Sequence, residues 1–188
     1  MRRVAGLGSV ALLLVCLLAQ GDERLFDEQG YRIAWLRSPT PETVEGARTL
    51  SVKQLEHLLH SEPTALLLDV LPLTWMGIWV ETEPHHSLPG AVWLPNVGRA
   101  ELNPLWDGYL DQNLERLTGG DKRHPLIVFC RADCWYSWNA VRRLVRRGYS
   151  DIYWYRLGTD GWLEAGHRLT DIDPEPMLER SEYSIEEK

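Results

Sequence analysis

The sequence predicts an α/β domain with a central, mostly parallel sheet flanked by helices. Short apolar runs such as "TALLLDV", "HPLIVFC" and "DIYWY" are typical of strands buried on both faces. Segments with the apolar period of a helix alternate with these runs, and that alternation is typical of parallel sheets. The length of 188 residues suits one such domain with short additions at its ends.

The chain opens with a pattern typical of a secretory signal peptide. Two arginines precede an apolar run from Val10 to Ala19, and small and polar residues follow, so we expect cleavage after Ala19 or Gly21. The run is too short to span a membrane comfortably, and cleavage would leave no stable membrane anchor. We therefore expect a periplasmic protein; an uncleaved anchor is the alternative.

The charge of the chain excludes nucleic acid as its partner. The net charge is −7, and loss of the two arginines in the signal peptide would make it about −9. An acidic surface repels phosphates, and no basic stripe compensates. Arg142, Arg143, Arg146 and Arg147 lie at helical spacing before Gly148, which is typical of cations in the last turn of a helix.

The chain divides into four parts. We expect a signal peptide at 1–21, a loop-like N-terminal extension at 22–50, the domain at 51–170 and an acidic, frayed tail at 171–188. The domain is expected to begin with a helix at 51–60, opened by the capping box Ser51-x-x-Gln54, and a strand at 64–70. A turn and short strand at 88–96, a helix from about 105 to 119 and a strand at 124–130 are expected next. A helix at 136–147 follows, with Trp138, Val141, Leu144 and Val145 facing inward, and then a strand at 151–155 and a loop with a short helix at 158–166.

Cys130 and Cys134 are the cysteines that remain if Cys16 leaves with the signal peptide. Cys130 ends a buried strand, and in parallel sheets ligands bind beyond the carboxyl ends of the strands. Backbone N–H groups at the start of the following helix would stabilise a thiolate, a persulfide or an oxyanion, and would lower the pKa of the thiol. A disulfide closing so short a loop constrains the unfolded chain little, which argues against a purely structural bridge.

The sequence resembles the rhodanese-like domain family from about Ser51 to His167. Four stretches carry the likeness in the right order: "LLLDV", "HSLPGAVWLP", "IVFC" and "RRGYSDIYWYRLGTDGWLEAG". The resemblance implies a rhodanese-like α/β fold, sulfane-sulfur transfer from a small donor, and Cys130 as the nucleophile that opens the active loop. It implies no cofactor.

More narrowly, "CRADCWYSWNA" and "GYRIAWLRSPTP" are similar to the exported rhodanese-like proteins named for a CXXCW motif. That family is associated with pyrroloquinoline-quinone (PQQ)-dependent alcohol catabolism, which implies a quinoprotein dehydrogenase or a cytochrome as partner. Three residues separate the cysteines here, instead of two. Trp135 stands where a sulfurtransferase loop commonly has an arginine, which weakens the case for the anion thiosulfate. Cys134 offers a resolving thiol in exchange.

The predicted site follows from these stretches. Cys130 is the expected nucleophile and Cys134 its resolving partner, in sulfane-sulfur transfer or thiol–disulfide exchange. The remaining expected site residues are the loop residues Arg131, Ala132, Asp133 and Trp135 and the supporting residues Asp69, His86 and Trp138.

Two other functions stay open. A non-catalytic binding module could dock a dehydrogenase, a cytochrome or the quinone on a tryptophan-rich face, with Trp135 and the "LTWMGIW" segment as the walls of one aromatic pocket. His85 and His86 could join the two cysteines in binding copper or zinc, although we expect no metal.

Overall fold

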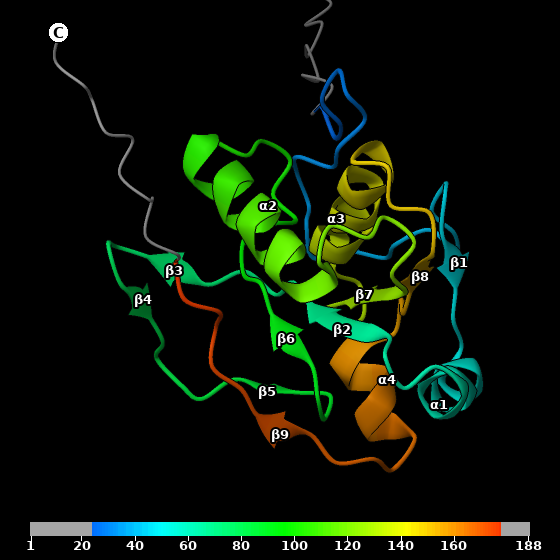
Figure 1. The fold of residues 1–188 in the computed structure, drawn as a ribbon. Helices are drawn as coiled ribbons and strands as arrows, with labels where there is room; N and C mark the ends of the chain where they lie inside the picture. Colours follow the sequence, from blue (N-terminus) through cyan, green and yellow to red (C-terminus); the bar gives the residue numbers. More distant parts are fainter. Residues whose placement is uncertain (1–23, 178–188) are drawn as a thin grey trace, which may run out of the picture.

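The computed structural model describes residues 24–177, in which a parallel sheet lies between two pairs of helices (Figure 1). The predicted signal peptide, Cys16 and the last part of the predicted tail lie outside the described residues. All strand pairs of the central sheet are parallel, which confirms the predicted α/β architecture. The sheet contains, in spatial order, β1 (Arg48–Thr49), β8 (Ile152–Trp154), β7 (Leu126–Phe129), β2 (Leu66–Asp69) and β6 (Val92–Trp93).

Strand β7 occupies the middle of the sheet. It pairs with β2 over four residues, from Leu66 opposite Leu126 to Asp69 opposite Phe129, and with β8 on its other side. Every residue of β7 is buried, as expected for a strand covered on both faces. The residue that follows this strand is therefore held at a fixed position at the carboxyl edge of the sheet.

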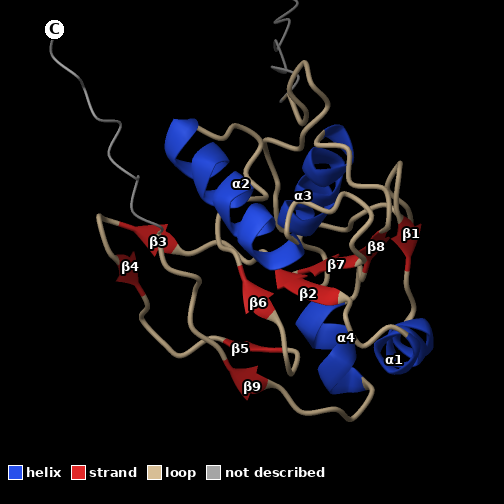
Figure 2. Cartoon of the chain, in the orientation of Figure 1, coloured by secondary structure: helices blue, strands red, loops and turns tan. Residues whose placement is uncertain are grey.

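Two helices cover each face of the sheet, as Figures 1 and 2 show. On one face α2 and α3 pack over a core that includes Leu68, Val128 and Trp154. On the other face α1 and α4 pack over Leu67 and Ile127. The helices are α1 (Val52–Ser61), α2 (Pro104–Thr118), α3 (Trp135–Arg146) and α4 (Gly158–Glu164).

The ends of the helices follow the predicted signals. Ser51 caps α1, and its capping box with Gln54 is formed as predicted. Helix α2 begins after Asn103, whose side chain accepts from Leu105 N and Trp106 N, and ends at Gly119 in the left-handed conformation.

The inward face of α3 differs from the prediction. Trp138 and Val145, expected inside, are half-buried, whereas Asn139 and Arg143 are buried. The reason is that the N-terminal extension and the loop after β6 also pack on this helix and need polar partners. Asn139 accepts a hydrogen bond from Arg32 N at 2.9 Å and donates to the carbonyls of Arg32 and Gly98 at 3.0 Å.

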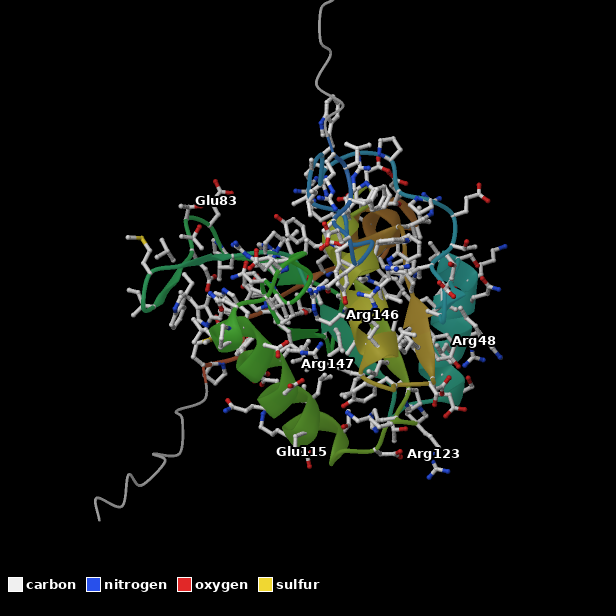
Figure 3. The ribbon with its side chains drawn as sticks, turned by 90° about the horizontal axis from the view of Figure 1, so that it is seen from above. Arg48, Glu83, Glu115, Arg123, Arg146 and Arg147 are labelled. Carbon is white, nitrogen blue, oxygen red and sulfur yellow. A yellow bond between two sulfur atoms is a disulfide. The ribbon has the colours of Figure 1, made fainter. Side chains whose placement is uncertain are left out.

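The arginines at the end of α3 cross-link neighbouring segments. Arg143 donates to the carbonyls of Val97 and Ala100, and burial lowers its pKa. Arg147 points toward α2 (Figure 3), where its guanidinium pairs with Asp107 and Asp111. Arg143 and Arg147 thus hold the end of α3 to its neighbouring segments.

Several short strands were not predicted. They are β1, the hairpin of β3 (Thr74–Trp75) with β4 (Trp79–Val80), and the antiparallel pair of β5 (His86–Ser87) with the distant β9 (Thr170–Asp171). The start of the predicted tail is therefore not frayed: beyond β9, Glu175 N donates to Trp93 O at 2.9 Å and the Glu175 carboxylate pairs with Arg116. Within residues 24–177, no helix has the length and apolar character needed to cross a membrane.

We expect Asn139→Ala to lower the free energy of unfolding by about 3 kcal/mol, because it leaves the buried Arg32 N–H and two carbonyls without partners. Urea denaturation followed by tryptophan fluorescence measures this. Gln112→Ala, at an exposed position of α2, is the control and should change the free energy by less than about 0.5 kcal/mol. Equal losses in the two variants would contradict the cross-linking role of Asn139.

Candidate active site

A disulfide joins Cys130 and Cys134 directly beyond the carboxyl end of β7. Each cysteine is 1% exposed, and both belong to the core between the sheet and helices α2 and α3. In this state neither sulfur titrates, so the expected lowering of the thiol pKa concerns the reduced protein. The Sγ of Cys130 lies 3.5 Å from the carbonyl oxygen of Cys134.

The loop between the cysteines turns sharply and leads straight into α3. Asp133 has φ 54°, in the left-handed region that aspartate tolerates better than most residues. Cys134 is the N-cap of α3. Its carbonyl accepts from Ser137 Oγ at 3.2 Å, and that hydroxyl accepts from Trp154 Nε1 at 3.0 Å. A buried hydrogen-bond chain thus connects the second cysteine to strand β8.

Helix α4 supports one side of the loop. The carboxylate of Asp160 accepts a hydrogen bond from Ala132 N at 3.0 Å and lies 3.5 Å from Nε of Arg131. Thr159 N donates to the carbonyl of Cys130 at 2.9 Å. Gly158 has φ +53°, and a Cβ there would lie 2.3 Å from that same carbonyl oxygen. The close approach therefore requires glycine at this position.

The N-terminal extension supports the other side of the loop. We call residues 35–38 the strap. Trp135 N donates to Leu36 O, and Ser38 N donates to Asp133 O, each at 3.0 Å, as in an antiparallel pair. Arg37 Nη1 donates to Ala132 O at 3.0 Å, and Trp135 Nε1 donates to Ser38 Oγ at 2.9 Å.

In the disulfide state, donors of the predicted anion cradle face oxygens of the protein. The expectation was that loop N–H groups and Arg131 would face a bound anion or persulfide. In the disulfide state the N–H of Ala132 and the guanidinium of Arg131 face Asp160, and the N–H of Trp135 faces Leu36. The protein's own oxygens thus already accept from the two backbone N–H groups, and the Arg131 guanidinium forms an exposed ion pair with Asp160. The loop can present these two N–H groups to an anion only after one of its supports moves.

Asp69, expected near the loop, lies on the opposite face of the sheet from Cys130. Its register partner Phe129 belongs to the core under α1 and α4, whereas Cys130 belongs to the other core. The buried carboxylate accepts from Leu71 N at 2.9 Å, from Ser87 Oγ at 2.7 Å and from His85 Nε2 at 2.8 Å. Asp69 therefore organises the β5 segment and does not orient Arg131.

The structure separates the two histidines that were considered as metal ligands. His86, expected to support the site, is exposed and pairs with Asp171 on β9 at 2.8 Å, while its neighbour His85 binds Asp69. Within residues 24–177 no three histidine, cysteine, aspartate or glutamate side chains converge in a manner suited to a metal ion.

The tryptophans do not form the single aromatic pocket that was expected. Trp75 and Trp79, from the "LTWMGIW" segment, pack with Trp106 on α2 at ring distances of 6.3 and 5.6 Å. Trp135 instead packs with Trp138 at 5.3 Å and with Phe26 of the N-terminal extension at 5.7 Å. Trp138 therefore supports the extension, through its ring contacts and a hydrogen bond from Nε1 to Thr43 O.

Asp160, Gly158 and the strap are functional features that the predicted site did not include. The first two had a usable signal: β8 neighbours β7, so the segment after β8 must lie beside the segment after β7. The strap had none from local pattern, because its pairing with the loop joins residues about a hundred positions apart. Its contact with the cysteine loop depends on how the extension wraps α3.

One comparison with known proteins gives a family match. The model of the rhodanese-like domain family matches residues 51–165, more than half of the chain. A search of curated proteins found no significant match.

Among solved structures, thiosulfate sulfurtransferase from Pseudomonas aeruginosa has 22% identity and a TM-score of 0.49, with 68% of this chain and 21% of that chain covered. This chain thus spans about a fifth of that enzyme. The polysulfide-sulfur transferase homodimer from Wolinella succinogenes has 22% identity and a TM-score of 0.45, covering 76% and 85%. An uncharacterized protein from Saccharomyces cerevisiae has 19% identity and a TM-score of 0.42, covering 64% and 93%.

We expect Gly158→Ala to lower the free energy of unfolding by about 3 kcal/mol, because the new methyl group overlaps the carbonyl of Cys130 and the residue must keep a positive φ. Gly166→Ala is the matched control: its φ is +88°, but no atom lies within 4 Å of the added Cβ. The control should lose only about 1 kcal/mol. Equal losses by urea denaturation would contradict a close contact between α4 and the loop.

Proposed function

Because the chain belongs to the rhodanese-like domain family, we propose that it handles sulfane sulfur through Cys130, with Cys134 as the resolving thiol. The observation that carries this proposal is the Cys130–Cys134 disulfide at the carboxyl end of β7. A strand end beside a helix N-terminus suits a reactive sulfur. A second sulfur within bonding distance gives the first a route of discharge that needs no external thiol.

The proposed reaction uses a persulfide or polysulfide donor. The Cys130 thiolate attacks the outer sulfur of the donor and keeps it, so that Cys130 becomes a persulfide. The remainder of the donor leaves as a thiolate or a shortened polysulfide, with the electron pair of the broken S–S bond. The Cys134 thiolate then attacks Sγ of Cys130, and hydrosulfide leaves with the electron pair of the broken S–S bond. The sulfane sulfur is reduced to hydrosulfide, and the two thiols are oxidised to the disulfide. An external dithiol must then reduce that disulfide.

The same persulfide can also serve as a sulfur donor. An acceptor thiolate that attacks the terminal sulfur before Cys134 reacts would receive it, and Cys130 would return to the thiolate. Which outcome prevails depends on the relative rates of the acceptor and of Cys134. The short loop keeps Cys134 four residues from Cys130 in sequence, which favours the internal reaction.

We further propose that this chemistry takes place in the periplasm, in support of PQQ-dependent alcohol oxidation. The signal-like pattern at 1–21 supports export, and a disulfide persists in an oxidising compartment. The likeness to the CXXCW-motif family supports the link to a quinoprotein dehydrogenase or a cytochrome. The two stretches that carry this likeness, residues 30–41 and 130–140, contact each other through the strap.

We expect the single-cysteine variants to separate the two steps. Reduced Cys134→Ser treated with an organic persulfide should keep one extra sulfur on Cys130, because its resolving thiol is missing. The wild-type protein should instead end as the disulfide and release one equivalent of hydrosulfide, and Cys130→Ser should do neither. Intact-mass spectrometry after thiol blocking measures each state. An extra sulfur that persists on the wild-type protein would contradict the role of Cys134.

A non-catalytic binding module is the second candidate, and one observation favours it. The N-terminal extension presents exposed apolar side chains next to the loop, with Trp35 64% exposed and Ile33 40% exposed. If the protein acts by binding a dehydrogenase or cytochrome through this surface, Trp35→Ala should abolish growth of the producing organism on the alcohol, while Cys130→Ser should not. Thiol chemistry predicts that Cys130→Ser abolishes growth.

A further inference from the structure

A loosely held segment lies beside the second cysteine of the disulfide. Upstream of the strap, Tyr31 and Arg32 are buried, and downstream Val44 is buried. Between these anchors, residues 33–43 include no buried side chain. A segment that buries so little apolar surface opens at a low free energy compared with the core. Hydrogen bonds to residues 132–135 therefore contribute much of what holds the strap beside the loop.

The hydrogen bonds of the strap join it to the loop residues on both sides of Cys134. The antiparallel bridge pairs Arg37 with Cys134, so the strap runs directly alongside the second cysteine. Both cysteines are 1% exposed with the strap in this position. Thiol–disulfide exchange needs a thiolate to approach one sulfur in line with the S–S bond. A sulfur with so little exposed surface offers no such approach until a cover moves.

Resting on the proposed function, we propose that the strap is a gate that determines which reductants reach the Cys130–Cys134 disulfide. When it lifts, an incoming thiolate attacks one sulfur, the Cys130–Cys134 bond breaks, and the other cysteine leaves as a thiolate. A second thiol of the reductant then attacks the mixed disulfide, which releases the dithiol protein and oxidises the reductant.

The open gate also defines the reductant that fits best. Lifting the strap frees the N–H of Trp135 and the carbonyl of Asp133, which it had paired with its own backbone. An extended chain of another protein can form the same two hydrogen bonds, because main-chain pairing does not depend on side-chain identity. The gate therefore favours a dithiol protein that presents an extended segment beside its reactive thiol. Small thiols gain no such contacts and depend on spontaneous opening.

We expect the double variant Arg37→Ala/Ser38→Ala to be reduced by dithiothreitol about tenfold faster than the wild-type protein, because it lacks the two side-chain hydrogen bonds between the strap and residues 132 and 135. Loss of a positive charge would by itself slow an anionic thiolate, so the acceleration cannot come from electrostatics. Thiol blocking at timed intervals followed by intact-mass spectrometry gives the rate.

Arg123→Ala is the matched control. Arg123 is an exposed arginine whose ion-pair partner is Asp121, and Figure 3 shows it far from the N-terminal segment drawn in blue. Its removal should leave the rate of reduction unchanged. Equal rates in the wild-type protein and the double variant would overturn the proposal, as would equal acceleration in the control.

Hydrogen exchange provides a second measurement that does not depend on the cysteines. The amide of Trp135, which donates to the strap, should exchange about tenfold faster in the double variant, while the amide of Val128 in β7 should be unaffected. Acceleration of both amides would mean that the variant is destabilised as a whole and would overturn the gate as the cause.

Failure of the gate and failure of the proposed sulfur chemistry are distinguishable. The rate of disulfide reduction requires no sulfane donor, so the gate can hold even if Cys134→Ser never retains an extra sulfur. Conversely, retention of that sulfur with strap-independent reduction would leave the proposed function intact and remove the gate alone.

Discussion

The position of β7 in the middle of the parallel sheet is the constraint on which the site depends. Hydrogen bonds from β2 and β8 fix the strand on both edges, and helices cover both its faces. A strand held in this way has no freedom to slide, since a shift by one residue would turn its apolar side chains to the wrong faces. Cys130 therefore lies at a defined point, and every other part of the site is arranged around it.

The loop that follows needs support because it joins the buried residues Cys130 and Cys134 without the hydrogen bonds of a helix or strand. Buried N–H and C=O groups without partners are costly, and the loop forms neither helix nor strand until α3 begins. Asp160 on α4 and the strap supply these partners from opposite sides. One support belongs to the domain and the other to the N-terminal extension, so the extension completes the environment of the cysteines.

This arrangement differs from a simple anion-binding loop. A loop that binds a free anion must keep its donors unpaired or bound only to water. Here Asp160 places a negative charge beside Arg131 and Ala132, which opposes an anion at that point. The supported loop is better suited to a reaction in which the negative charge stays on the sulfurs of Cys130 and Cys134 and in which Asp160 or the strap can move away from the loop. The proposed exchange between persulfide, dithiol and disulfide has that character.

The sequence by itself determined β2, β6, β7 and β8 of the sheet, the start of α1, the end of α2 and the cysteine pair at the end of a strand. These features depend on local patterns: the continuous apolar run before Cys130, the capping box at Ser51 and the glycine after α2. Only the tertiary structure decided what surrounds the cysteines. The pairing of the strap with the loop and the placement of Asp69 on the opposite face join segments distant in sequence. A local pattern carries no information about such pairings, because they arise from how the elements pack.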